Sequence, residues 1–206
     1  MSREFTRLRA VAAPFPSPNI DTDAILPARY LKRIEIAGLG KVLFNEWRYT
    51  GEGTERPEFV LNQAPYRNAQ VLVAGANFGC GSSRENAVWA LYDYGIRCVI
   101  APSFGDIFYT NAVGYGLLPV VLPPPQVESL LAELAAAPGT QVEVDLPAQE
   151  IRLGAGGVAS FSIDAAAKHR LVNGLDEIAL TLEREAEIAA FEERRRRERP
   201  WLYPAT

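Results

Sequence analysis

The sequence predicts an α/β fold in which a small parallel sheet with helices is joined by an additional β-layer. Short valine-rich apolar runs alternate with segments of helical spacing in the middle of the chain. Glycines close those helical segments, and later runs alternate polar and apolar residues like β-strands joined by turns. Strands that alternate with helices at this spacing indicate parallel pairing through right-handed crossovers.

The parallel part is predicted from three buried strands and the helices between them. The strands are expected at residues 70–75, 98–103 and 119–124. The first helix is expected over residues 83–95, after a glycine-rich turn, and the second over residues 104–116. Each ends at a glycine, which can adopt the left-handed conformation that closes a helix.

The additional β-layer follows later in the chain. Its three alternating segments are residues 141–146, 150–154 and 157–163. Turn residues at Pro147 and over 154–157 separate them. Residues 164–174 then predict a helix for which Asp164 is the N-terminal cap.

The whole chain, residues 1–206, is expected to form a single domain with a C-terminal helix over about 183–199. Pro200 is expected to end that helix. Glutamates interleave with the arginines of 194–197 at helical spacings, which favours a solvated helix over a nucleic-acid patch. The polar, glycine-rich loop within residues 28–56 is expected to be mobile without a partner.

Composition excludes several classes of protein. The formal net charge of -4 argues against a broad binding surface for nucleic acid or an anionic membrane. Pro, Gly or charged residues interrupt every apolar run, so no membrane span is expected. Two cysteines do not form a disulfide framework, and the N-terminal residues lack the apolar core of a signal peptide. A cytoplasmic location is therefore expected.

A glycine-rich elbow, residues 75–84, lies between the first predicted strand and the helix after it. Ligands bind at this position in open α/β sheets because backbone N–H groups and the helix dipole converge there on an anion. The glycines at 75, 79 and 81 do not match the dinucleotide-binding spacing, and no lysine follows them as in a phosphate-binding loop.

A serine hydrolase is also disfavoured, because the single histidine, His169, lies in a predicted helix far from the elbow in sequence. One histidine excludes a multi-histidine metal site, and no metal ligands are expected in this chain. The hydroxyls of Ser82 and Ser83 and the planar guanidinium of Arg84 fit a small di- or tricarboxylic acid. Alternatively, a serine caps the helix while Arg84 pairs with Glu85 or Asp93.

Several ordered motifs resemble one family over nearly the whole chain. They include "NIDTDAILPARYL", "FGCGSSREN", "DYGIRCVIAPSF", "DLPAQEI" and "FSIDAAAKHRLVNGLDEIALTL". This set closely resembles the small subunits of 3-isopropylmalate dehydratase, in the aconitase superfamily. The resemblance implies the swivelling β/β/α domain that forms the last domain of aconitase. It also implies a separate large subunit that carries a [4Fe-4S] cluster, and a dicarboxylate substrate isomerised by dehydration and rehydration in leucine biosynthesis.

The resemblance also implies roles for particular residues. Ser82 matches the general base of the superfamily, and Ser83 and Arg84 match its substrate-binding pair. Asp23, with Asp21 and Thr22, matches the other polar active-site stretch. This implies a catalytic role for Asp23 and substrate binding for Thr22, whereas Asp21 is expected mainly to cap the following segment. Leu31 is expected to face the alkyl group of the substrate.

One departure from the family motif leaves alternatives open. Asn86 replaces the usual histidine, and an amide cannot carry a proton at neutral pH. A related hydro-lyase, homoaconitase-like or acting on another alkylmalate, therefore remains an alternative. Two further alternatives are a non-catalytic carboxylate-binding module and an enzyme active without a second chain. Neither Cys80 nor Cys98 is expected to bind the cluster, because two cysteines cannot hold four irons.

Overall fold

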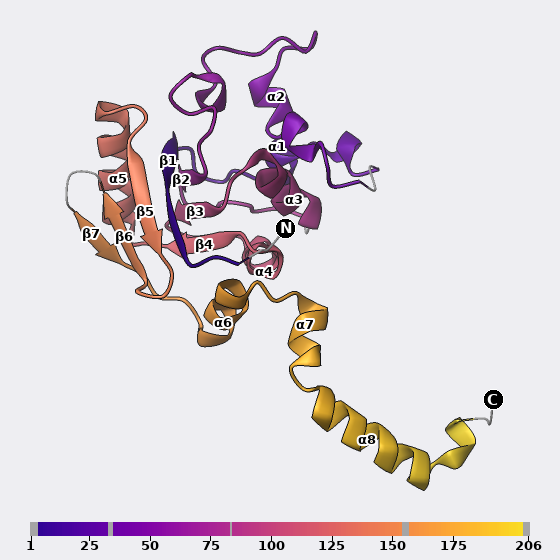
Figure 1. Ribbon diagram of the computed structural model, residues 1–206. Helices are drawn as coiled ribbons and strands as arrows, with labels where there is room; N and C mark the ends of the chain where they lie inside the picture. Colours follow the sequence, from indigo (N-terminus) through magenta and orange to yellow (C-terminus); the bar gives the residue numbers. More distant parts are fainter. Residues whose placement is uncertain (1–3, 33–34, 83, 154–156, 204–206) are drawn as a thin grey trace. The chain divides into compact units, whose positions relative to one another are not determined.

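The computed structural model describes residues 4–32, 35–82, 84–153 and 157–203. The chain divides into two compact units, Met1–Gly174 and Leu175–Thr206. The first holds the sheet and the helices that cover it, and the second is helical (Figure 1). The expectation that the whole chain acts as a single swivelling domain stays a prediction.

In the first unit, the described strands form one mixed sheet in the order β4-β3-β2-β1-β5-β6-β7 (Figure 1). The strands are β1 (Arg7–Phe15), β2 (Val71–Ala74), β3 (Cys98–Ala101), β4 (Leu118–Val121), β5 (Gln141–Asp145), β6 (Glu150–Leu153) and β7 (Val158–Ser160). Strands β1 to β4 pair in parallel, and β5 to β7 continue the sheet from β1 in antiparallel pairing. The predicted parallel strands and the additional β-strands are both confirmed, and they share β1.

The helices of the first unit connect the strands. They are α1 (Thr22–Ile25), α2 (Asn45–Arg48), α3 (Glu85–Tyr94), α4 (Asp106–Tyr115), α5 (Pro124–Ala136) and α6 (Ala165–Asn173). Left-handed Gly95 and Gly116 close α3 and α4, as predicted. The Asp164 carboxylate caps α6 by accepting backbone N–H groups at 2.9 and 3.1 Å, which confirms its predicted role. Short 3₁₀ turns at Ala28–Tyr30, Leu39–Val42 and Val60–Asn62 complete this unit.

The sheet separates two buried clusters because successive strand residues face opposite sides. In β2, Leu72 and Ala74 join the cluster that α3 and the segment before β2 cover. Val71 and Val73 join the cluster covered mainly by α5. Both faces of the parallel strands are thus buried, which accounts for their continuous apolar sequences.

The sequence pattern did not predict β1 or α5. β1 is central to the sheet, yet it begins with the charged segment "RLR". The two arginines are exposed, and the leucine between them is partly buried. The first half of β1 pairs antiparallel with β5 and its second half parallel with β2, so it lacks a uniform apolar run. The strand predicted over residues 119–124 ends earlier, at Val121, and Pro124 begins helix α5; proline is tolerated in the first turn because the N–H that it lacks has no partner within the helix.

The second unit contains α7 (Glu177–Leu182), α8 (Glu185–Glu198) and a 3₁₀ turn at Pro200–Leu202. None of its described helical residues is buried. Helix α8 ends before Pro200, and the side chains of Glu192 and Arg196 pair one turn apart at 3.9 Å. A helix thus lies at about the predicted position, and its solvation in the assembled protein stays a prediction. Among the described residues, no helix is both long and apolar enough to cross a membrane.

Candidate functional site

The elbow lies where β1, β2 and β3 end, and the loops that follow these three strands meet there. Hydrogen bonding between neighbouring strands resumes beyond the strand ends. The Gly79 N–H donates to the Ile20 carbonyl at 2.7 Å, and the Gly105 N–H donates to the Phe78 carbonyl at 2.9 Å. This continuation fixes the elbow at the carboxyl edge of the parallel strands, the usual place for a ligand in such sheets.

Close backbone packing accounts for the elbow's glycines. A Cβ atom on Gly75 would lie 2.5 Å from the Ser17 carbonyl oxygen, and one on Gly79 would lie 2.2 Å from the Phe108 ring. Gly81 has a φ of 92°, in the left-handed region that glycine adopts readily. The glycines at 75, 79 and 81 do not match a dinucleotide site, and in the structure they allow neighbouring segments to pack closely.

Residues 21–23 form a strap that holds the elbow. The Asp21 carboxylate accepts the Ala24 N–H at 2.7 Å and caps α1, as the sequence predicted. The buried Thr22 donates its N–H to the Cys80 carbonyl at 3.0 Å and its hydroxyl to the Ser82 carbonyl at 2.9 Å. The strap and the elbow are thus joined by both backbone and side-chain hydrogen bonds.

Arg84 forms a bidentate ion pair with Asp23, including an Nη2–Oδ2 bond of 3.0 Å. The hydrogen bond from Arg84 is the main reason that the pKa of Asp23 lies below its ordinary value, although partial burial opposes the shift. Asp23 is therefore ionised near neutral pH. The Arg84 side chain is 15% exposed and that of Asp23 56%, so the guanidinium is the more enclosed partner.

The alternative interpretation is wrong for Arg84, which pairs with Asp23 and not with Glu85 or Asp93, whereas a helix cap from Ser83 lies outside the described residues. Helix α3 begins at Glu85 with no side-chain cap, and Arg84 occupies the capping position. The Asp93 carboxylate accepts the N–H groups of Gly38 and Gly40 instead of pairing with Arg84. Ser83 lies outside the described residues, so its predicted role in substrate binding stays a prediction.

Ser82 is exposed at a hollow of about 180 Å³. The hollow is lined by Gly79, Gly81, Ser82, Gly105, Asp106, Ile107 and Phe108. Within the described part of the chain, no hydrogen bond engages the Ser82 hydroxyl. The first turn of α4 lines the hollow and α3 begins three residues after Ser82, so both positive helix ends favour an anion nearby.

Asp106 and Ile107 also line the hollow, and neither was predicted from the sequence. Both lie at the start of α4, and the exposed Ile107 gives the hollow an apolar edge. The sequence did contain a pattern that indicates this location. In "APSFGDIF" the end of a predicted strand is followed directly by the start of a helix, as in the elbow. The volume is below the roughly 300–1,000 Å³ of typical small-molecule pockets, which favours a site that this chain forms only in part.

Three other residues that the sequence brought into question, Leu31, Asn86 and His169, are not part of the hollow's lining. Leu31 follows the first 3₁₀ turn, is half-buried and packs against the cluster under α3. Its contact with an alkyl group stays a prediction. Asn86 is the second residue of α3 and is half-buried. His169 lies on α6, where its ring nitrogen is 3.1 Å from the Asn173 amide.

The residues of this chain do not fit an iron–sulfur cluster. Cys80 is half-buried in the elbow, whereas Cys98 is fully buried in β3, where burial raises the pKa of its thiol. The sequence has only these two cysteines, while a four-iron cluster is usually held by four thiolates. Across the described residues, no three His, Cys, Asp or Glu side chains gather in a way that could hold a metal ion.

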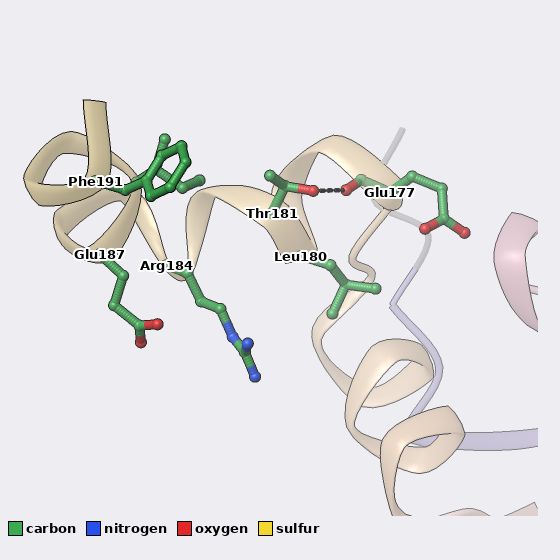
Figure 2. A pocket seen from close by; sticks show the side chains of 7 residues that line it. Glu177, Leu180, Thr181, Arg184, Glu187 and Phe191 are labelled. Carbon is green, nitrogen blue, oxygen red and sulfur yellow. Dashed lines mark hydrogen bonds between the residues drawn. The ribbon is translucent and has the colours of Figure 1, made fainter. Parts of the chain in front are cut away.

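The second unit carries a separate groove of about 510 Å³ between α7 and α8. It is lined by Glu177, Leu180, Thr181, Arg184, Glu187, Ile188 and Phe191. Figure 2 shows the apolar side chains of Leu180 and Phe191 with the charged ends of Arg184 and Glu187. An exposed groove with an apolar lining and a charged rim is more typical of a protein-contact surface than of a catalytic site.

Three family models match successive parts of the chain. Residues 2–125 match the family model of the aconitase C-terminal domain. Residues 128–165 match LeuD_N, and residues 177–205 match the C-terminal domain of the 3-isopropylmalate dehydratase small subunit.

Curated relatives match over almost their entire length. The 3-isopropylmalate dehydratase small subunit of Parvibaculum lavamentivorans is 55% identical over 97% of this chain and 99% of its own. That of Paramagnetospirillum magneticum is 56% identical over the same shares. A crystal structure of 3-isopropylmalate dehydratase from Methanocaldococcus jannaschii covers 89% of this chain and 98% of its own, with a TM-score of 0.67 and 28% identity. The predicted fold class is confirmed, and the chain belongs to the family of 3-isopropylmalate dehydratase small subunits.

Proposed function

We propose that this chain is the small subunit of a 3-isopropylmalate dehydratase. The complete enzyme interconverts 2-isopropylmalate and 3-isopropylmalate by dehydration and rehydration, a step of leucine biosynthesis in the cytoplasm. The observation that carries the proposal is the placement of Ser82 at an open hollow on the carboxyl edge of the parallel strands, two residues before Arg84, which is ion-paired to Asp23 at the start of α3. Family membership over nearly the full chain supports the same activity.

In this proposal Ser82 removes the proton from the carbon next to the one that loses its hydroxyl group. A free hydroxyl is a very weak acid, so negative charge on its oxygen must be stabilised. The starts of α3 and α4 and the cation of Arg84 supply positive potential near Ser82. On rehydration, the same oxygen returns its proton to the carbon that lost the hydroxyl group, and a hydroxyl group from water adds at the neighbouring carbon.

Arg84 binds a carboxylate of the substrate. The bonds to Asp23 use two of the five N–H donors of a guanidinium, so the side chain retains capacity for a second carboxylate. Asp23 holds the guanidinium in place, and the catalytic role that the family resemblance implies for it stays a prediction. Ser83, by resemblance, donates a further hydrogen bond to the substrate.

A large subunit completes the site. In this proposal it carries the iron–sulfur cluster, which supplies a Lewis acid for the departing hydroxyl group. The small volume of the hollow and the lack of cluster ligands in this chain both support a shared site. Exposed apolar side chains on the second unit, such as Ile178 at 71% and Leu182 at 56%, support a protein partner as well.

Reconstitution tests the proposal. This chain, a cluster-loaded large subunit of the family, and their mixture are each given 2-isopropylmalate, and product formation is followed by NMR. Turnover is expected in the mixture alone. Turnover by this chain alone, or tight binding of an alkylmalate to it without turnover in the mixture, would instead support one of the alternatives that the sequence left open.

Asn86 favours one second candidate, a related hydro-lyase with a different alkylmalate or homocitrate as substrate. The amide at this position cannot titrate near neutral pH as a histidine would. A panel of alkylmalates and homocitrate, assayed with the same mixture, distinguishes the two. A value of kcat/KM that is highest for isopropylmalate supports the first assignment, and a higher value for another acid supports the second.

A further inference from the structure

Thr22 is a buried residue of the strap and donates two hydrogen bonds to the elbow. It is 3% exposed, and both of its donor groups point to elbow carbonyls. Its N–H binds the Cys80 carbonyl and its hydroxyl binds the Ser82 carbonyl. Because these two carbonyls flank Gly81, one side chain and its own backbone hold both ends of the left-handed turn.

The surroundings of Gly81 explain why this hold sets the position of Ser82. A Cβ atom on Gly81 would lie 3.5 Å from the Asp21 Cβ and 3.7 Å from the Thr22 hydroxyl oxygen, so the turn lies directly against the strap. Glycine allows many backbone conformations at this point, and an external contact is needed to select one. The Thr22 hydroxyl supplies that contact at the carbonyl of Ser82 itself.

The hydroxyl of Thr22 therefore donates its proton to the main chain and not to a substrate. Substrate-binding hydroxyls face the ligand, whereas this one is buried and donates to the main chain. Asp23, the next residue, in turn holds Arg84. The strap thus contacts the elbow at the residue that removes the proton and at the residue that binds a carboxylate.

We propose that Thr22 is a positioning residue for Ser82, acting through the Ser82 carbonyl, and that it does not bind substrate. This inference rests on the proposed function, since it assumes that Ser82 acts as the base. Loss of the Thr22 hydroxyl then lets the Gly81 turn relax and moves the Ser82 oxygen from the reacting carbon. Displacements of about 1 Å can reduce rates by about 100-fold.

The test uses the assembled complex with the large subunit and the substitutions Thr22→Val, Thr22→Ser and Thr140→Val. Thr22→Val removes the hydroxyl while keeping the shape of the side chain, and Thr22→Ser keeps the hydroxyl. Thr140→Val is the matched control, because the Thr140 hydroxyl also donates to a main-chain carbonyl, that of Ala137, before β5. Rates are expressed per assembled complex, so that poor assembly is measured separately.

The expected result for Thr22→Val is a kcat lower by about 10- to 100-fold with KM within about twofold. Thr22→Ser is expected to retain kcat within about threefold, and Thr140→Val to match the wild type. A rise in KM at constant kcat for Thr22→Val would overturn the proposal in favour of substrate binding. Equal losses in Thr22→Val and Thr22→Ser would overturn it in favour of packing by the methyl group.

Ser82→Ala, measured in parallel, separates this inference from the proposed function. If Ser82→Ala is inactive and Thr22→Val has a normal kcat, the positioning role is wrong while the proposed base stands. If Ser82→Ala turns over at the wild-type rate, the proposed base itself is wrong, and the Thr22 inference is overturned with it.

Discussion

The two halves of the sheet share β1 but differ in what lies at their strand ends. On the parallel side, crossover helices separate the strands, so successive loops and helix starts gather at one edge. On the antiparallel side, β5 to β7 follow one another directly, and charged side chains pair within the sheet, as Arg7 of β1 with Asp145 of β5 and Arg152 with Glu150 of β6. Parallel topology thus concentrates reactive groups, whereas the antiparallel strands complete the core. Matched substitutions in the two halves test this distinction.

The largest difference is expected between two serines. Ser82→Ala removes the proposed base and should lower kcat of the assembled complex by about 10²- to 10⁴-fold. Ser160→Ala, at an exposed position on β7, should leave kcat unchanged. Equal rates for the two variants would show that the parallel edge does not carry the proton transfer.

Two arginines give the next comparison. Arg84→Lys replaces the planar fork with a single ammonium group and should raise KM about tenfold, with a smaller change in kcat. Arg152→Lys, on β6 and 2.7 Å from Glu150, should change neither value. Steady-state kinetics on both variants measure this. A normal KM in the Arg84→Lys variant would argue against bidentate binding of the substrate.

Two glycines with similar φ values allow an effect on stability to be distinguished from an effect on activity. Gly81 and Gly139 have φ values of 92° and 87°, and an added Cβ would meet only ordinary contacts at each. Gly81→Ala and Gly139→Ala should each lower the free energy of unfolding by about 1–2 kcal/mol. Thermal or chemical unfolding measures that loss. Turnover should fall for Gly81→Ala alone, and a matching fall for Gly139→Ala would contradict a local role of the elbow.

The smallest effect is expected at Asp145. The Ala148 N–H, followed by the Arg7 guanidinium, holds the pKa of Asp145 below its ordinary value of 3.8. The ionised form therefore stabilises the fold above that pH, and this contribution is lost as the pH falls through the lowered pKa. Asp145→Asn should reduce the free energy of unfolding by about 1 kcal/mol near neutral pH and by less near pH 3, without changing turnover. A pH-independent difference between variant and wild type would contradict the assigned cause.

The parallel strands and their helices could be predicted from sequence because each is a local pattern. Valine-rich runs, helical spacing and the closing glycines at 95 and 116 all lie within single elements. β1 could not be predicted in this way, because its two halves pair with strands about 60 and 130 residues further along the chain. Its alternation depends on neighbours that a local window does not contain.

The candidate site likewise combines a feature that is local in sequence with contacts between distant residues. The elbow was found from its place between a strand and a helix, which is a local signal. The bond between Thr22 and Ser82 and the ion pair between Asp23 and Arg84 join residues 60 and 61 positions apart. No periodicity encodes such contacts, and the sequence associated these residues only through the family resemblance. The structure supplies the contacts, and from them follows the distinction between holding the elbow and binding the substrate.

Hydrogen exchange on the substrate tests the central claim most directly. The assembled complex is incubated with 3-isopropylmalate in deuterated water, and proton NMR follows the hydrogen on the carbon next to the hydroxyl-bearing one. The wild-type complex should exchange this hydrogen, and a Ser82→Ala complex that still binds substrate should do so at least about 100-fold more slowly. Exchange at the wild-type rate in the Ser82→Ala complex would show that another group removes the proton.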